Sequence, residues 1–262
     1  MRALIVTAVA AEADSVAAGL TPHPDPVTPE PRTLPWGSPR TKSGGGYLIT
    51  RRDLPGLAAD VLVGGVGPAA AAAGTATALA LADYSLVISA GIGGGFAPAA
   101  PLGSLVVADA LVAADLGAET PEGFLPVQEL GFGRSVHLPP AELAARAAEA
   151  TGALLAPVLT VSTVTGSAAR AAELAARHPL AGAEAMEGFG VAEAAAAHGL
   201  PVLEVRAVSN AVGPRDRAAW RIGDALAALT AGFRALGPVL VNWGERHERH
   251  EQHERHEHHE HG

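Results

Sequence analysis

Val61-Leu62-Val63-Gly64-Gly65-Val66-Gly67-Pro68 is the part of the sequence that says most about its architecture. The apolar residues at its start form a continuous run, which is typical of a strand buried on both faces of a sheet. The glycines that follow permit a tight turn and let a ligand approach the backbone closely. Pro68 suits the first position of a helix, where the N–H that it lacks would have no partner within the helix. The stretch therefore predicts a strand, a turn able to contact a ligand, and a helix.

The same alternation of strand and helix patterns recurs along the chain. Short apolar runs predict strands near residues 3–9, 47–51, 61–66, 86–90, 104–109, 158–162 and 202–208. Alanine-rich stretches predict helices near residues 12–20, 68–82, 140–151, 167–177, 187–198 and 217–236. Strands that alternate with helices favour an α/β fold, with a central, mostly parallel (mixed) sheet flanked by helices.

The composition fits one domain that handles a small molecule. The chain has 262 residues, 48% of them hydrophobic, which is enough to bury a large core. The formal net charge of -9 offers no basic surface to nucleic acid, and no Lys/Arg stripe predicts docking on a membrane. The absence of cysteine excludes disulfides, thiolate metal sites and a cysteine nucleophile, and it suits a reducing compartment such as the cytoplasm.

No targeting or membrane-spanning segment is predicted. The apolar run of residues 3–11 ends at Glu12 and Asp14, where a signal peptide would continue apolar, so we interpret it as a buried first strand. No stretch is expected to reach the roughly 20 apolar residues that a spanning helix needs. We therefore expect neither a membrane nor a nucleic acid as partner.

Two segments depart from the α/β pattern. Residues 21–46 contain seven prolines and a glycine run, which predicts a long surface loop, either a disordered insertion or a functional lid. Residues 244–262 repeat Glu, Arg and His and predict a disordered, solvated tail. The folded domain is then residues 1–243. Adventitious binding of Ni or Zn by the tail remains an alternative, through His247, His250 and His253.

A second glycine turn, Ser89-Ala90-Gly91-Ile92-Gly93-Gly94-Gly95, follows another apolar run. A dinucleotide-binding fingerprint is the obvious rival interpretation of such turns. Neither turn has the spacing G-x-G-x-x-G, and Pro98 follows the second turn closely, so no helix is predicted where a pyrophosphate would need one. Nicotinamide binding is therefore disfavoured, and we expect no cofactor and no metal.

Two glutamates stand in otherwise apolar surroundings. Glu12 follows the first predicted strand, and a carboxylate at the end of a strand faces the crevice where α/β proteins bind ligands. Glu12 also fits an ordinary charge at a helix N-terminus, where it interacts with the helix dipole. Glu187 lies between Met186 and Gly188-Phe189, which suggests a packed setting, although a solvated helix residue is the alternative.

A third motif, Arg206-Ala207-Val208-Ser209-Asn210, ends the last predicted strand and is followed by Arg215-Asp216-Arg217. It combines a strand end, an amide and clustered charge. Taken separately, Asn210 also fits a turn former, and the later charges also fit a surface ion network. Three such signals at three strand ends favour a common site.

These motifs together resemble the purine nucleoside phosphorylase and methylthioadenosine/adenosylhomocysteine (MTA/SAH) nucleosidase superfamily over almost all of residues 1–240. The resemblance rests on Thr7-Ala8-Val9-Ala10-Ala11-Glu12, Val63-Gly64-Gly65-Val66-Gly67, Ser89 to Gly95, Met186-Glu187-Gly188 and Arg206-Ala207-Val208-Ser209-Asn210. Within the superfamily the chain is most similar to the futalosine hydrolases, through Glu187 to Gly190 and Ser209 to Arg217. The resemblance implies a phosphorylase/hydrolase-like fold and cleavage of an N-glycosidic bond.

The resemblance also implies a role for each matching residue. Glu12 would activate the attacking water, assisted by Arg206 and Ser209. Glu187 would accept hydrogen bonds from ribose hydroxyls while Met186 packs on the sugar. The remaining matches are Gly93 and Gly94 beside the nucleoside and, more loosely, Val164 beside the base. Futalosine carries a benzoate, for which an arginine and an aromatic wall are expected, with the nominees Arg215, Arg217, Phe124 and Phe189.

Two departures from related enzymes narrow the expected reaction. Adenine-releasing relatives have Asp at the position of Asn210, whereas an amide can donate to O6 and accept from a protonated N7, which suits hypoxanthine. Phosphorylases bind phosphate with arginines near the first strand, where this chain has alanines and Glu12. A carboxylate there repels phosphate, which favours water as the nucleophile.

The expected activity is hydrolysis of futalosine to hypoxanthine and dehypoxanthine futalosine, which the resemblance places in menaquinone biosynthesis. Relatives are commonly homodimers or larger assemblies, so a homo-oligomer is expected. The alternatives are an MTA/SAH- or inosine-type nucleosidase, a phosphorylase and a non-catalytic nucleoside-binding protein.

Overall fold

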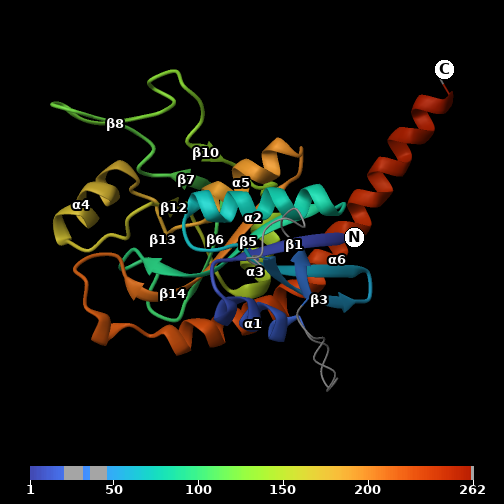
Figure 1. The fold of residues 1–262 in the computed structure, drawn as a ribbon, viewed down its shortest axis with the longest axis horizontal. Helices are drawn as coiled ribbons and strands as arrows, with labels where there is room; N and C mark the ends of the chain where they lie inside the picture. The colour runs from blue at the N-terminus through green and yellow to red at the C-terminus, as the bar shows by residue number, and fades with distance from the viewer. Residues whose placement is uncertain (21–31, 36–45, 261–262) are drawn as a thin grey trace.

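The computed structural model describes residues 1–20, 32–35 and 46–260, with side chains for residues 1–20 and 47–246. It has three layers, because helices cover both faces of a central mixed sheet (Figure 1). The helices are α1 (Ala10–Gly19), α2 (Pro68–Leu81), α3 (Ala141–Thr151), α4 (Ala168–Arg177), α5 (Gly188–Ala197) and α6 (Ile222–Glu260), and the 3₁₀ helix η1 (Arg217–Ala219) precedes α6. The α/β fold class predicted from the sequence is confirmed.

The central sheet has twelve strands. Its main path runs through β10 (Val136–His137), β7 (Leu111–Ala113), β12 (Val158–Thr160), β13 (Ala183–Ala185), β5 (Leu86–Gly95), β1 (Arg2–Thr7), β4 (Leu57–Val63), β3 (Gly46–Leu54) and β2 (Arg32–Pro35). Off this path, β5 also pairs with β14 (Val202–Ala211), which pairs with β6 (Leu105–Val107), and β6 pairs with β11 (Leu154–Leu155). A separate hairpin consists of β8 (Gly117–Thr120) and β9 (Gly123–Pro126).

The strands at the centre of the sheet are parallel. β1 pairs in parallel with β4 and β5, and β5 pairs in parallel with β14. Their carboxyl ends therefore meet at one edge, which is where open α/β sheets bind ligands. The motifs around Glu12, Gly93 and Asn210 all follow or end strands of this group.

Alternation along β1 explains the two layers of helices. Ala3 and Ile5 are fully buried in a core shared with α1, α3 and α6, whereas Leu4 and Val6 are buried in a core shared with α2 and α5. Successive side chains of a strand point to opposite faces, so a continuous apolar run is required when both faces are covered.

Helix α6 is the largest element on its side of the sheet. Phe233, Leu236 and Leu240 are fully buried against the strands, and the helix packs along α1 and α3. Residues Ile222–Arg246 are long and apolar enough to cross a membrane by length and composition. The expectation that no stretch would reach that length was wrong, because this segment contains an 18-residue window with a mean hydropathy of 1.4 and at most two charged residues. The buried part, 39% of that apolar window, packs against the sheet and its neighbouring helices.

Several short strands were not predicted. β7, β11 and β13 have two or three residues each and lie outside every predicted strand, whereas the equally short β12 lies inside the strand predicted near 158–162. A run of this length is too short to carry a periodic signal. β13 also contains Glu184, a charged residue that is buried and accepts hydrogen bonds from Thr165. The local sequence does not reveal this distant partner.

The two segments outside the α/β pattern also differ from expectation. Within residues 21–46, predicted to be a loop, residues 32–35 form β2 against β3, while 21–31 and 36–45 lie outside the described residues. Residues 244–260 continue α6 instead of forming a disordered tail. Glu and Arg are good helix formers, and this stretch has no proline to end the helix. The proposed metal ligands His247, His250 and His253 lie outside the residues with described side chains.

A buried carboxylate, Asp60, joins β4 to its neighbours far from the carboxyl edge. It accepts hydrogen bonds from Arg2, Arg51 and Tyr84 at distances of 2.5 to 3.0 Å. Burial raises the pKa of Asp60, but the hydrogen bonds from Arg51, Arg2 and Tyr84 outweigh it and bring that pKa below its ordinary value.

Asp60→Asn is expected to lower the free energy of unfolding at neutral pH by about 1 to 3 kcal/mol, toward the lower end because Arg2 and Arg51 are partly exposed. A carboxyl group whose pKa is lower in the folded than in the unfolded state stabilises the fold above its unfolded pKa of about 3.9, and this stabilisation is lost as the pH falls below it. Urea titrations between neutral pH and about pH 3 should therefore converge for the two proteins. An equal difference at all pH values would contradict the assignment.

Candidate active site

Glu12 lies in the first turn of α1, directly after the carboxyl end of β1, and is only 3% exposed. Its Oε2 accepts hydrogen bonds from the backbone N–H groups of Ala8 (3.0 Å) and Val9 (3.2 Å), and its Oε1 accepts one from Ile92 (2.9 Å). Glu12 thus caps its own helix, as the interpretation of it as a charge at a helix N-terminus predicts. The bond to Ile92 also ties it to the glycine turn of β5.

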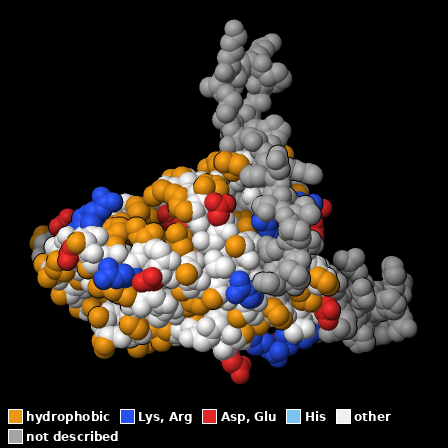
Figure 2. Space-filling model, turned by 90° about the horizontal axis from the view of Figure 1, so that it is seen from below, with side chains coloured by type: hydrophobic (Ala, Val, Ile, Leu, Met, Phe, Trp, Pro, Cys, Tyr) orange, Lys and Arg blue, Asp and Glu red, His pale blue; other side chains and the backbone are white. Residues whose placement is uncertain are grey.

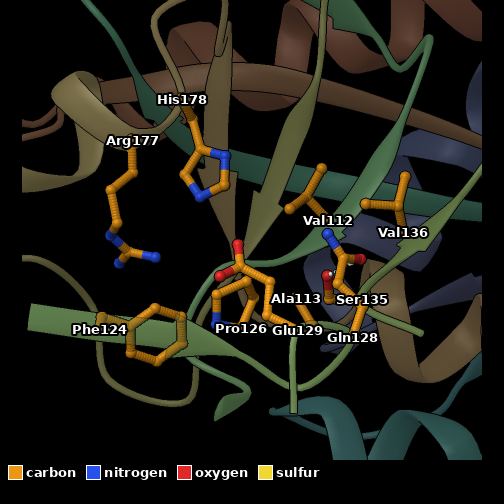
Figure 3. Close-up of a pocket in the computed structure, with 10 residues that line it drawn as sticks. All are labelled: Val112, Ala113, Phe124, Pro126, Gln128, Glu129, Ser135, Val136, Arg177 and His178. Carbon is orange, nitrogen blue, oxygen red and sulfur yellow. Dashed lines mark hydrogen bonds between the residues drawn. The ribbon is translucent and has the colours of Figure 1, made fainter. Parts of the chain in front are cut away.

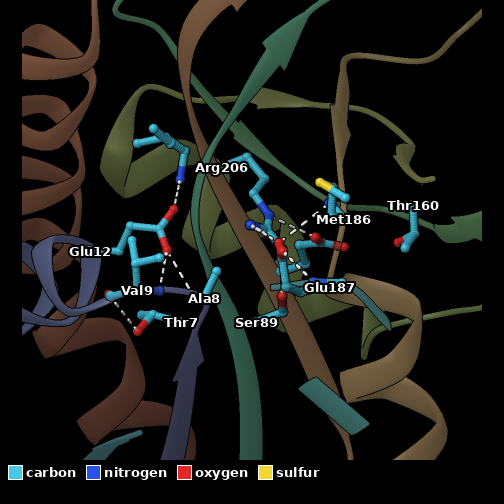
Figure 4. Close-up of polar contacts among 12 residues, drawn as sticks. Thr7, Ala8, Val9, Glu12, Ser89, Thr160, Met186, Glu187 and Arg206 are labelled. Carbon is cyan, nitrogen blue, oxygen red and sulfur yellow. Dashed lines mark hydrogen bonds and ion pairs between the residues drawn. The ribbon is translucent and has the colours of Figure 1, made fainter. Parts of the chain in front are cut away.

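Arg206 of β14 is the centre of the polar contacts in Figure 4. Its three guanidinium nitrogens donate in three directions: Nε to Glu204 Oε1 (2.8 Å), Nη1 to Glu187 Oε2 (3.1 Å) and Nη2 to Ser89 Oγ (2.9 Å). The side chain is 1% exposed. A planar donor fork buried among acceptors holds their geometry rigidly.

Glu187 stands at the junction of β13 and α5. It is buried, at 5% exposed, so the prediction of a packed setting is confirmed and the solvated alternative is wrong. Its Oε1 accepts from the N–H of Gly67 (3.2 Å), and its Oε2 accepts from the N–H of Met186 (3.3 Å) as well as from Arg206. Gly67 has a φ of 91°, in the left-handed region that glycine tolerates. The first glycine turn therefore presents its backbone to Glu187.

The charges of this cluster shift the acidity of Glu12. Burial raises the pKa of the Glu12 carboxyl above its ordinary value of 4.5; the charge of Arg206 and the N–H groups of Ile92 and Val9 oppose this, whereas the charge of Glu187 adds to it. A carboxylate with a raised pKa is a better proton acceptor than a free one. Such a group in a ligand-binding edge is typical of an acid/base site.

Gly91 separates Glu12 from Arg206. A Cβ at this position would lie 2.6 Å from Glu12 Oε1 and 2.8 Å from Arg206 Nη1. No side chain fits there without moving one of the two. The glycine of the second turn is therefore needed for packing of the polar groups as well as for any approach of a ligand.

Asn210, Ser209, Gly93 and Gly94 form a second group farther along the β5–β14 pair. The register shifts between Val208 and Asn210, which places a bulge at Ser209, and such bulges re-aim side chains. Ser209 Oγ lies 3.2 Å from the carbonyl oxygen of Gly93 and 2.9 Å from Asn210 Oδ1, and Asn210 Nδ2 donates to the carbonyl of Ala211 (3.1 Å). Ser209 thus contacts Asn210, and the role beside Glu12 that the resemblance implies for it stays a prediction.

The segment that contains Val164 is anchored to the same edge. Thr165 donates to Glu184 through its N–H (2.9 Å) and its hydroxyl (2.5 Å), and Glu184 pairs with Gly94 across the sheet. Val164 itself is 38% exposed. The N–H of Arg215 donates to the carbonyl of Gly166 (3.2 Å), which brings the arginine-rich loop beside this segment.

Arg215 and Arg217 lie over the ring of Trp220, and among the residues with described side chains neither forms an ion pair with Asp216. Their guanidinium carbons are 5.3 and 5.7 Å from the centroid of the Trp220 ring. Asp216 instead accepts from the N–H of Ala218 and caps η1. Trp220 was not among the predicted site residues, although it follows the predicted motif by only a few positions.

The two phenylalanines nominated for the aromatic wall have their own partners in the structure. Phe189 is buried, its N–H donates to Thr160 Oγ1 (2.9 Å), and its ring packs 5.1 Å from that of His137. Phe124 lines a separate cavity of about 430 Å³ beside Arg177, whose guanidinium stacks on its ring at 4.3 Å (Figure 3). Their roles toward a ligand stay predictions.

Sequence reasoning missed two members of the Arg206 cluster. Ser89 was noted only as the start of a glycine turn. Glu204 was not noted, although it interrupts the apolar run Val202-Leu203-Glu204-Val205. Its spacing of two residues from Arg206 puts both side chains on one face of a strand, and that signal could have found it.

The described part of the chain contains no group of three or more His, Asp or Glu side chains placed to hold a metal ion. On the face seen in Figure 2, Lys and Arg side chains lie apart, among hydrophobic and acidic ones.

Comparisons with known proteins agree with this geometry. Residues 2–233 match the model of the phosphorylase superfamily. The futalosine hydrolase of Streptomyces coelicolor is 61% identical over 248 residues, which cover 93% of this chain and 98% of that protein.

Among solved structures, futalosine hydrolase of Helicobacter pylori aligns with a TM-score of 0.74 at 17% identity, over 90% of this chain and 97% of that one. An MTA/SAH nucleosidase of Colwellia psychrerythraea, in complex with adenine, aligns with a TM-score of 0.72 at 21% identity, over 92% and 95%. At these identities the structures establish the fold, which agrees with the predicted one. From the family model and the 61% identity together, the chain belongs to the phosphorylase superfamily and, within it, to the futalosine hydrolase family.

Proposed function

We propose that this protein hydrolyses the N-glycosidic bond of futalosine and releases hypoxanthine and dehypoxanthine futalosine. The observation that carries the proposal is the meeting of Glu12 and Glu187 around Arg206 at the carboxyl edge of the parallel strands. The 61% identical relative is named for this reaction. An N-ribosyl hydrolase needs a proton acceptor for water and a group that orients the ribose, and the two glutamates supply both.

Glu12 is the base in this mechanism. As the bond to the departing base lengthens, C1′ becomes oxocarbenium-like and water adds to it. Glu12 takes a proton from that water, and its raised pKa suits this task. Both oxygens of Glu12 already accept backbone N–H groups, two on Oε2 and one on Oε1, which keeps the carboxylate in one orientation and leaves an acceptor position on Oε1 for water.

Glu187 orients the ribose. Its carboxylate is held by Gly67, Met186 and Arg206, so it is preorganised to accept hydrogen bonds from sugar hydroxyls. Met186 precedes it and supplies an apolar surface for the sugar. Arg206 acts on both glutamates through its charge, since it pairs with Glu187 and opposes the rise in the pKa of Glu12.

Asn210 steadies the departing hypoxanthine. Its amide can donate to O6 and accept from a protonated N7. In the ligand-free protein the amide nitrogen donates to Ala211 and the oxygen accepts from Ser209. Binding of the base exchanges these contacts for those to O6 and N7, and Gly93 and Gly94 provide room beside it.

Asn210→Asp is expected to change which base is released. The carboxylate cannot donate to O6, so the ratio of kcat/KM for futalosine to kcat/KM for its 6-amino counterpart, which carries adenine, should fall by about tenfold to a hundredfold. The ratio of hypoxanthine to adenine released from the two nucleosides measures this. An unchanged ratio would place the base away from Asn210.

Arg215, Trp220 and Arg217 are the best-supported receptors for the benzoate. Their stacking presents two guanidinium groups over an aromatic ring, and Arg215 borders the segment of Val164. A guanidinium matches a carboxylate through two parallel hydrogen bonds.

Arg215→Ala combined with Arg217→Ala is expected to raise the KM for futalosine by about tenfold while leaving the KM for inosine unaltered, since inosine lacks the benzoate. Equal effects on the two substrates would point to a structural role.

Water, rather than phosphate, is the proposed nucleophile. The residues from Ala8 to Ala11 offer no cation where phosphorylases bind phosphate, and Glu12 adds a negative charge. Purified protein with futalosine, in a buffer without phosphate or added metal, should release hypoxanthine. A requirement for phosphate would favour a phosphorylase; release of adenine from methylthioadenosine instead would favour the nucleosidase alternative; and binding without base release would favour a binding protein.

The proposed setting is the cytoplasm, with a homodimer or larger homo-oligomer and a place in menaquinone biosynthesis. The absence of cysteine suits a reducing compartment. Light scattering of the purified protein tests the assembly.

A further inference from the structure

A third carboxylate, that of Glu204, contacts Arg206 and is not used by the mechanism above. Glu204 lies two residues before Arg206 on β14, so both side chains lie on the same face of the strand. Its Oε1 accepts from Arg206 Nε at 2.8 Å, and the two side chains are 0% and 1% exposed. Solvent therefore does not screen this pair.

Helix α5 closes over the other oxygen of Glu204. A Cβ at Gly188 would overlap Oε2, so only glycine lets the first residue of α5 pass over this carboxyl group. Among the described residues, Oε2 accepts no hydrogen bond. Arg206 makes the main contact that holds the Glu204 carboxyl group, and the Ser89 hydroxyl adds a weaker one.

The contact with Glu204 also fixes the direction of the rest of the guanidinium. Because the group is planar, holding Nε in place sets where Nη1 and Nη2 point. Nη1 points to Glu187 and Nη2 to Ser89. Glu204 therefore contributes, through Arg206, to fixing the Glu187 carboxylate, which the N–H groups of Gly67 and Met186 also hold.

We propose that Glu204 is a positioning residue, which fixes the plane of Arg206 and takes up part of the positive charge that Arg206 would otherwise offer to Glu12. The kinetic consequence rests on the proposed function, whereas the effect on Glu12 does not. Glu204 touches no reacting atom, and its influence passes entirely through Arg206.

The charged groups that face Glu204 in the described structure are Arg206 on its own strand and Glu187 at the start of α5, and β5 contributes the Ser89 hydroxyl. Glu12 on α1 faces the same guanidinium. Burial raises the pKa of Glu204, which the charge of Arg206 opposes and that of Glu187 reinforces. Because these carboxylates share one cation, removing the charge of one changes the proton affinity of the others.

Two variants separate geometry from charge. Glu204→Gln keeps an oxygen that can accept from Nε but removes the negative charge, whereas Glu204→Leu removes both. Asp60→Asn is the matched control, because it removes another buried, arginine-paired carboxylate far from Arg206.

The first measurement is the titration of Glu12 in the ligand-free protein, followed by the NMR shift of its carboxyl carbon. Glu204→Gln should lower the pKa of Glu12, an increase in its acidity of about tenfold, because Arg206 then offers it more charge. Asp60→Asn should leave that pKa as it is. If Glu12 had the same pKa in Glu204→Gln as in Asp60→Asn, Glu204 would not share the charge of Arg206 with Glu12, and the proposal would be overturned.

The second measurement is turnover of futalosine across pH. Glu204→Leu should lose about tenfold to a hundredfold in kcat/KM, with substantial rescue in Glu204→Gln and an acid limb that moves to lower pH. Equal loss in Glu204→Leu and Asp60→Asn would reduce Glu204 to a structural residue. Where Glu204→Leu does not fold, Glu204→Gln still decides. A wild-type protein that releases no base would end the proposed function, while the titration of Glu12 would still test the positioning role.

Discussion

Glu12→Gln is expected to lower kcat for futalosine by about 10²- to 10⁴-fold while substrate binding stays measurable. The amide cannot take a proton from water, so the step that Glu12 performs loses its base. One carboxylate oxygen is also replaced by an NH₂ group facing the N–H of Ile92 or those of Ala8 and Val9. Some loss of stability will accompany the loss of turnover.

Two measurements separate catalysis from stability in this variant. Calorimetric titration with futalosine reports binding, and Asp60→Asn shows how much turnover falls when another buried carboxylate is lost. In the wild type, kcat/KM should decline toward acid with an apparent pKa above the ordinary 4.5 of Glu12, because burial raises it. Turnover of Glu12→Gln at the wild-type rate would remove Glu12 from the chemistry.

The fold was largely predictable because its central strands are buried on both faces. A continuous apolar run such as that of residues 3–9 is visible without an alignment, and the glycine turn before Pro68 marks where a strand gives way to a helix. Strands of two or three residues lack that signal and depend on neighbours distant in the chain. The end of α6 was misplaced for a different reason, since polar composition alone does not distinguish a solvated helix from a disordered tail.

The site was predictable where a polar residue follows a strand, as Glu12 and Glu187 do. What the sequence did not reveal is how these residues are divided among partners. Ser209 turned out to contact Asn210, because a bulge re-aims it. All three groups of donor nitrogens in the Arg206 guanidinium are bonded, to Glu187, Glu204 and Ser89, and these four residues come from three separate segments of the chain. Such convergence is a property of tertiary packing.

The burial of Arg206 among carboxylates makes its replacement the most damaging change for stability. Arg206→Met leaves Glu187 and Glu204 buried without their cation, and breaking a buried pair in this way typically costs about 3 to 5 kcal/mol. Turnover should fall with it, since Glu187 loses the contact that orients it. The stability of Arg206→Lys is expected to lie between those of the wild type and Arg206→Met. Lysine keeps the positive charge, but its single ammonium group cannot reach three acceptors in different directions.

The pH dependence of stability distinguishes this explanation from simple loss of packing. In Arg206→Met the pKa of Glu204, already raised by burial, rises further, so the folded state holds a proton that the unfolded state releases. A carboxyl group whose pKa is raised in the folded state does not lower the free energy of unfolding at pH values below its unfolded pKa of about 4.3. It lowers that free energy increasingly as the pH rises above this value. Urea titrations should therefore show a deficit for Arg206→Met that shrinks from neutral pH toward about pH 5. A deficit of constant size would mean that the methionine disturbs packing alone, and that the carboxylates around position 206 do not depend on its charge.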